Sequence, residues 1–152
     1  MEYEIRIVDV EAQPAAVVRG EVGLAAIGQF VGDAFARVMQ VAAAQGLAIT
    51  GAPFGRFEPR GDTFGVAAGF PVSQLPVGQD GVEPIELPAG PTAQVMHQGP
   101  YDGVSAAYRA IEEWGREHDY EASAPPWECY LDGPEVPEPR TLVVAPCRPR
   151  VA

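Results

Sequence analysis

Hydrophobic residues recur along the chain with two different spacings. Between Val22 and Ala44 they recur every three or four positions, which is typical of a helix with one buried face. Gly46 follows at the place where a glycine commonly ends a helix. Elsewhere in the first half, apolar and polar residues alternate or form short apolar runs, which predicts strands. These strands are expected at 2–10, 15–19, 48–57 and 63–72.

The same order of elements returns in the second half, after a linker predicted at 73–82 from its proline and glycines. Gly99-Pro100 opens a helix, because proline is tolerated in a first helical turn. The apolar stripe of this helix is Val104, Tyr108, Ile111 and Trp114. The strands expected around it lie at 83–87, 92–97, 127–131 and 141–145.

Short stretches of the two halves also match each other. The segment Pro14-Ala-Ala-Val-Val resembles Pro91-Thr-Ala-Gln-Val, and Ala52-Pro-Phe-Gly-Arg-Phe resembles Pro125-Pro-Trp-Glu-Cys-Tyr. Each half is strand, helix, strand, strand, and each is too small to bury its own core. We therefore predict a single α+β domain over residues 1–152. In it, pseudo-repeats 1–75 and 82–148 share one antiparallel sheet with both helices on one face.

Charge narrows the choice of partners. The chain has 21 acidic and 10 basic residues, a net charge of −11, and every basic residue is arginine. Phosphate repels such a chain, which argues against nucleic acid and against anionic membranes as partners. Cationic ligands or a basic protein partner fit better. No apolar stretch is long enough to cross a membrane, and residues 1–10 are too charged for a signal peptide, so we expect a cytoplasmic protein.

The sequence lacks the usual motifs for cofactors and metals. Cys129 and Cys147 have no CxxC spacing and predict two free thiols. His97 and His118 fit neither a metal-binding pair nor a Ser-His-Asp arrangement. The glycines beginning at Gly20 lack the phosphate-binding P-loop pattern, and the chain has no lysine. We expect neither a cofactor nor a metal ion.

Three motifs of the second half are distinctive together: Leu87-Pro-Ala-Gly, His97-Gln-Gly-Pro-Tyr-Asp and Pro125-Pro-Trp-Glu-Cys-Tyr. With a looser match of the first half, through its helix and Gly51-Ala-Pro, the whole chain resembles the GyrI-like family. This family includes the effector-binding domains of AraC-type and MerR-type regulators. The resemblance implies a tandem repeat with a ligand cleft at the repeat junction, lined by aromatic rings around a glutamate. The chain lacks a helix-turn-helix, so it resembles a free-standing form.

Glu128 is the expected centre of that site. Strand alternation places Glu128 and Tyr130 on one face and Trp127 on the other. Taken alone, this pattern also fits a solvated carboxylate on an open antiparallel face. The resemblance instead favours a cleft, which we expect on the face away from the helices. The aromatic residues expected to line it are Tyr3, Phe54, Phe57, Tyr101, Trp127 and Tyr130.

Three functions remain open at this point. The resemblance favours multidrug binding, in which the cleft takes bulky hydrophobic molecules that are cationic or electrophilic. The alternative is a hydrolase of cyclopropane-bearing natural products, with Glu128 as general base and Tyr101 or Tyr130 as proton donor. A third possibility is a protein-interaction module of the gyrase-inhibitor kind. One pocket could serve binding or turnover, so the sequence does not separate these functions.

Overall fold

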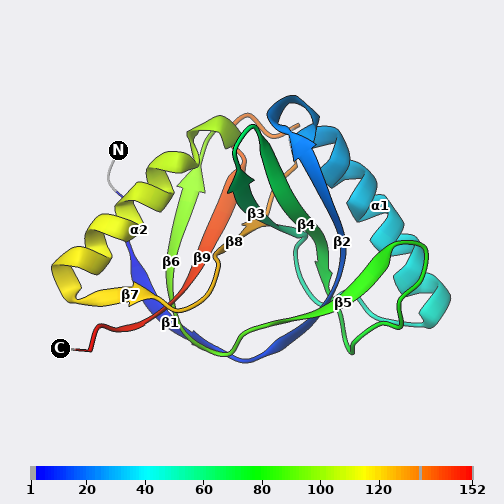
Figure 1. Cartoon of the computed structure of the whole chain (residues 1–152), viewed down its shortest axis with the longest axis horizontal. Coiled ribbons are helices and arrows are strands. Elements are labelled where there is room, and N and C mark those ends of the chain that lie inside the picture. Colours follow the sequence, from blue (N-terminus) through cyan, green and yellow to red (C-terminus); the bar gives the residue numbers. More distant parts are fainter. Residues whose placement is uncertain (1–2, 134, 152) are drawn as a thin grey trace. The chain divides into compact units, whose positions relative to one another are not determined.

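The computed structural model describes residues 3–133 and 135–151 and divides into two compact units. One unit, here the N-unit, is Ala12–Leu87. The other, the C-unit, combines Met1–Glu11 with Pro88–Ala152. Each unit consists of antiparallel strands and one long helix, and Figure 1 shows each helix lying along strands of its own unit. The predicted mixed α+β class is therefore confirmed.

The N-unit has the strand order β5-β2-β4-β3. Helix α1 packs against β2 and β4 through a core that contains Val18, Val38 and Ala68. The helix ends at Gly46, which has a φ of 70° and caps it as the sequence predicts. The elements are β2 (Gln13–Gly23), the 3₁₀ turn η1 (Leu24–Ala26), α1 (Ile27–Gln45), β3 (Phe54–Arg60), β4 (Thr63–Pro71) and β5 (Val82–Leu87).

The C-unit has the strand order β1-β6-β9-β8, with β7 paired to β9. Its helix covers a core of Val95, Ala107 and Val143. The short strand β7 was not predicted, and it pairs with the end of β9. The elements are β1 (Arg6–Val10), β6 (Gly90–Gln98), the 3₁₀ turn η2 (Tyr101–Gly103), α2 (Ser105–His118), β7 (Tyr120–Ala122), β8 (Trp127–Tyr130) and β9 (Arg140–Pro149).

The two units repeat the same topology. In each, a strand, a helix and two further strands of the main sheet follow in sequence, with the short β7 added in the C-unit. The last strand lies between the other two. The outer strand of each unit comes from the chain that leads into the other unit, because β1 pairs with β6 and β5 pairs with β2. Repeat 1 was expected to begin at residue 1, whereas β1 belongs to the C-unit.

The strand register makes Gly55 of the N-unit equivalent to Glu128 of the C-unit. Gly55 lies opposite Ala68, which lies opposite Val18. Glu128 lies opposite Val143, which lies opposite Val95. The tandem repeat therefore carries one carboxylate at this position instead of two.

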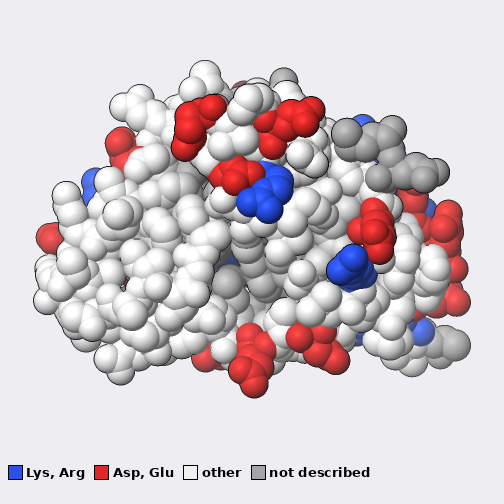
Figure 2. Space-filling model, turned by 180° about the vertical axis from the view of Figure 1, so that it is seen from behind, with Lys and Arg blue, Asp and Glu red and all other residues white. Residues whose placement is uncertain are grey.

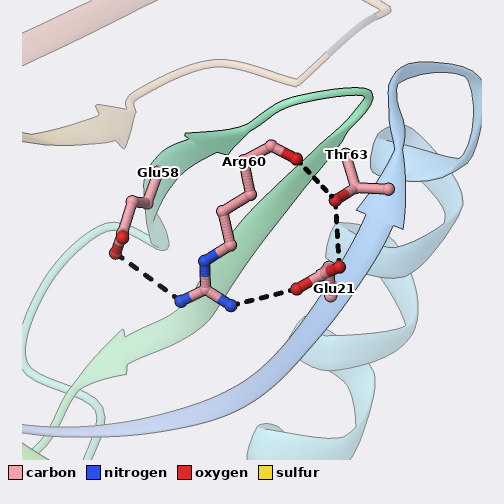
Figure 3. Close-up of polar contacts among 4 residues, drawn as sticks. All are labelled: Glu21, Glu58, Arg60 and Thr63. Carbon is pink, nitrogen blue, oxygen red and sulfur yellow. Dashed lines mark hydrogen bonds and ion pairs between the residues drawn. The ribbon is translucent and has the colours of Figure 1, made fainter.

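A polar cluster on the N-unit joins the β3–β4 hairpin to β2 (Figure 3). The Arg60 guanidinium lies 3.1 Å from Glu21 Oε1 and 3.6 Å from Glu58 Oε2. The Thr63 hydroxyl lies 3.0 Å from the other oxygen of Glu21. The three charged groups are exposed, and the hydrogen bond from Arg60 lowers the pKa of Glu21. The cluster stabilises the hairpin end locally and belongs to the surface.

No helix among the described residues has the length and apolar character needed to cross a membrane.

Candidate functional site

Glu128 lies on the helix-covered face of the C-unit sheet. It is opposite Val143 in β9, whose side chain belongs to the core under α2. Directly opposed residues of an antiparallel pair project to the same face, so Glu128 also projects toward α2. We expected the carboxylate on the face away from the helices. The alternation within β8 was predicted correctly, but the side of the sheet was wrong.

Two tyrosine hydroxyl groups donate hydrogen bonds to the Glu128 carboxylate, one to each oxygen. Tyr108 of α2 donates to Oε2 at 2.7 Å, and Tyr130 of β8 donates to Oε1 at 3.1 Å. Glu128 is 8% exposed. A carboxylate that is so far removed from water needs such donors, because an unpaired buried charge is strongly unfavourable. We call Tyr108, Glu128 and Tyr130 the Glu128 cluster.

Burial controls protonation in this cluster. It raises the pKa of Glu128, and the hydrogen bonds from the two tyrosines and the charge of His97 only partly oppose this effect. Burial and the neighbouring carboxylate also raise the pKa of Tyr108 and of Tyr130 far above their usual range. Both phenols therefore stay protonated as donors, and Glu128 takes up a proton more readily than an exposed glutamate does.

The next row of the sheet places two more polar side chains, Thr141 and His97, beside the cluster. Thr141 of β9 lies opposite His97 of β6 on one side and Tyr130 on the other. His97 Nε2 lies 2.9 Å from the carbonyl oxygen of Pro100, and its Nδ1 lies 2.9 Å from the Tyr3 hydroxyl. Because a carbonyl only accepts, Nε2 carries a hydrogen and donates to Pro100, while Nδ1 is the nitrogen bonded to the Tyr3 hydroxyl. Tyr3 thus reaches the site through His97.

Tyr101 contacts the cluster through its ring. It packs edge-to-face on Tyr130, with the ring centroids 5.8 Å apart. Its hydroxyl donates to the carbonyl oxygen of Asp132 at 3.0 Å and therefore points to a different partner from the carboxylate. Tyr101 is 38% exposed, so it lies nearer to solvent than Glu128, which is 8% exposed.

The other aromatic candidates are Trp127 of the C-unit and Phe54 and Phe57 of the N-unit. Trp127 opposes Val144 and projects to the face away from α2, as the alternation predicted. Phe54 holds the equivalent position in β3 and is fully buried on the corresponding face of the N-unit. Phe57 packs against the core beneath α1. Within the C-unit, Trp127 is therefore separate from the Glu128 cluster, whereas Phe54 and Phe57 belong to the N-unit.

Tyr108 was assigned to the helix core and missed as a site residue. It does pack on that core, yet its hydroxyl makes the shortest contact to Glu128. The available signal was a phenol in an otherwise apolar helical stripe, since a buried tyrosine hydroxyl usually finds a partner.

The described part of the chain contains two cysteines and no group of candidate metal ligands. Cys129 and Cys147 are free thiols, and burial raises the pKa of Cys129 to about 11. No group of three or more His, Cys, Asp or Glu side chains in residues 3–133 and 135–151 could hold a metal ion.

The chain matches the model of the GyrI-like small molecule binding domain over residues 3–145. It therefore belongs to the GyrI-like family, as its motifs indicated. No curated protein matches the sequence.

Solved structures share the fold at low sequence identity. The C-terminal domain of EcmrR has a TM-score of 0.83 at 18% identity, with 98% of this chain and 99% of that chain covered. This chain spans 58% of the longer EcmrR chain in its complex with DNA. SAV2435 bound to tetraphenylphosphonium has a TM-score of 0.59 at 14% identity, covering 97% and 94% of the two chains. A hydrolase from Listeria innocua has a TM-score of 0.67 at 11% identity, covering 95% and 92%.

Proposed function

We propose that the Glu128 cluster binds a bulky hydrophobic cation, and that the protein is a small-molecule-binding domain for such compounds. The observation that carries the proposal is a carboxylate that is 8% exposed and whose hydrogen-bond donors are two neutral phenols. Ionising a buried carboxylate without a cationic partner is unfavourable. Neither donor to the carboxylate is charged, and a ligand cation would place a positive charge directly beside it.

The aromatic rings and the overall charge support the same ligand class. Tyr130 donates to the carboxylate, and the ring of Tyr101 packs on the ring of Tyr130. A cation over such a ring gains about 0.5–2 kcal/mol. The net charge of −11 attracts cations to the protein as a whole. The tetraphenylphosphonium bound to SAV2435 is a hydrophobic cation held by a protein of similar fold.

Titration with tetraphenylphosphonium tests the proposal. Glu128→Gln should weaken binding about tenfold or more, because a hydrogen bond or contact with a charged group contributes about 1.5–3 kcal/mol. Glu113→Gln is the matched control, since it changes the net charge equally from the exposed face of α2. Triphenylphosphine oxide, a neutral probe of similar shape, should bind Glu128→Gln and Glu113→Gln with the same affinity. Equal affinity of wild type and Glu128→Gln for the cation would overturn the proposal.

A hydrolase is the second candidate, favoured by the raised pKa of a carboxylate placed between two phenols. In that reaction Glu128 removes a proton from water as the oxygen attacks a strained cyclopropane carbon. The ring bond breaks, and a tyrosine protonates the leaving atom. The product is heavier than the substrate by one water molecule. Mass spectrometry after incubation with an electrophilic cyclopropane would detect it with the wild type and miss it with Glu128→Gln.

A further inference from the structure

One buried hydroxyl beside the Glu128 cluster has no hydrogen-bond partner among the described residues. Thr141 is fully buried, and its Oγ1 is the orphaned atom. Leaving a buried polar group unsatisfied is unfavourable, and most such groups in proteins are paired. Thr92, equally buried on the neighbouring strand, shows the usual arrangement because its Oγ1 donates to the Val8 carbonyl oxygen at 2.7 Å.

The strand register places the Thr141 side chain on the same face of the sheet as the Glu128 cluster. Thr141 lies directly opposite Tyr130, whose hydroxyl donates to Glu128. It is also two residues from Val143, the residue opposite Glu128, so all of these side chains share the α2 face. Thr141 and Glu128 are therefore diagonal neighbours, whose side chains start about 7–8 Å apart or somewhat less.

A single ammonium group can donate hydrogen bonds to two such neighbours at once. Its N–H groups donate in different directions, and each N···O hydrogen bond spans about 2.8 Å. A carboxylate accepts about four hydrogen bonds, so Glu128 retains acceptor positions beyond those used by Tyr108 and Tyr130. Thr141 Oγ1 offers the second acceptor. A cation whose charge is enclosed by alkyl or aryl groups satisfies neither oxygen with a hydrogen bond.

We infer that Thr141 is a specificity-determining contact of the Glu128 site, and that the site prefers protonated amines over cations that carry no N–H group. This inference rests on the proposed function. It narrows the ligand class from hydrophobic cations in general to hydrophobic ammonium ions. The orphaned hydroxyl is unfavourable for folding and is satisfied when such a ligand binds.

Two matched variants test the inference, first through stability. Thr141→Val keeps the shape of the side chain and removes a hydroxyl without a partner, so its urea midpoint should equal or exceed that of the wild type. Thr92→Val removes a hydroxyl that donates a hydrogen bond and leaves the Val8 carbonyl oxygen without this donor. Its urea midpoint should therefore fall. A fall for Thr141→Val as large as that for Thr92→Val would overturn the inference, because the hydroxyl would then have a partner in the native fold.

Calorimetric titration with two probes completes the test. The probes are 1-naphthylmethylammonium and its N,N,N-trimethyl analogue. The wild type should prefer the first, and Thr141→Val should lose about tenfold affinity for it while binding the second unchanged. Thr92→Val should keep the wild-type ratio. Binding of both probes with a ratio unaltered in Thr141→Val would overturn this inference alone. Failure of the wild type to bind either probe would overturn it together with the proposed function.

Discussion

Replacing Tyr108 with phenylalanine removes one of the two donors to Glu128 and keeps the packing of the ring. The hydrogen bond is 2.7 Å long and ends on a carboxylate that is 8% exposed. Little water is available to replace the lost donor. The variant should therefore be less stable than the wild type, and by more when Glu128 is ionised than when it is protonated.

The size of the effect follows from the charge on the acceptor. A hydrogen bond to an ionised group contributes about 1.5–3 kcal/mol, whereas one between neutral groups contributes about 0.5–1.5 kcal/mol. Tyr108→Phe should thus lower the free energy of unfolding by roughly 1 kcal/mol more at high pH than at low pH. Proton linkage predicts the same pH dependence of stability, because losing this donor raises the folded-state pKa of Glu128 further. A carboxyl whose pKa is higher in the folded state destabilises the fold as pH rises through that pKa.

Urea denaturation of wild type and variants over a series of pH values, from below the ordinary glutamate pKa to pH 8, measures this difference. Tyr130→Phe should show the same trend with a smaller amplitude, since its bond is 3.1 Å long. Tyr101→Phe is the control, because its hydroxyl donates to a backbone carbonyl and its effect should not change with pH in this way. A loss for Tyr108→Phe that is constant across the series would refute the reasoning.

Four further predictions concern stability and partners. Glu128→Gln should be more stable than Glu113→Gln at neutral pH in urea denaturation, because it removes a buried charge, and the gain should vanish at low pH, where Glu128 is protonated. Gly69→Ala should lose about 3 kcal/mol or more, because the added Cβ would collide with the Ala16 carbonyl oxygen of β2. Gly32→Ala on the open face of α1 should instead gain about 0.5–1 kcal/mol. Duplex DNA should not bind at physiological salt in a mobility-shift assay, because on the face in Figure 2 the basic side chains stand apart among acidic ones.

Much of the fold could be predicted from hydrophobic periodicity and from the positions of glycine and proline. The helical stripe ending at Gly46 and the alternation of residues 63–72 correspond to α1 and β4. The match of 52–57 with 125–130 anticipated the equivalence of Gly55 and Glu128, which the strand register shows. The strand expected to begin at residue 48 begins instead at Phe54, directly after Pro53. Proline there removes a backbone donor, and only Ile49 upstream forms an isolated bridge.

The site was harder to predict than the fold. Alternation within β8 correctly separated Glu128 from Trp127, but it does not tell which face a helix covers. That depends on how the chain crosses from β6 through α2 to β8, and the packing of Val143 under α2 reveals it. Tyr108 was not predicted as a hydrogen-bond donor to Glu128 for a related reason. Helical periodicity shows which side chains are buried and is silent on the partner of a hydroxyl at the end of one of them.

The central claim is that Glu128 is the counter-charge for a bound cation, and the pH dependence of cation affinity tests it most directly. Tetraphenylphosphonium carries a permanent charge, so only the protein titrates. Its affinity for the wild type should fall as pH decreases through the raised pKa of Glu128, beginning above the ordinary glutamate value of 4.5. Glu128→Gln should bind the cation weakly, with an affinity that does not change over the same range. Identical pH profiles for the wild type and Glu128→Gln would contradict the claim.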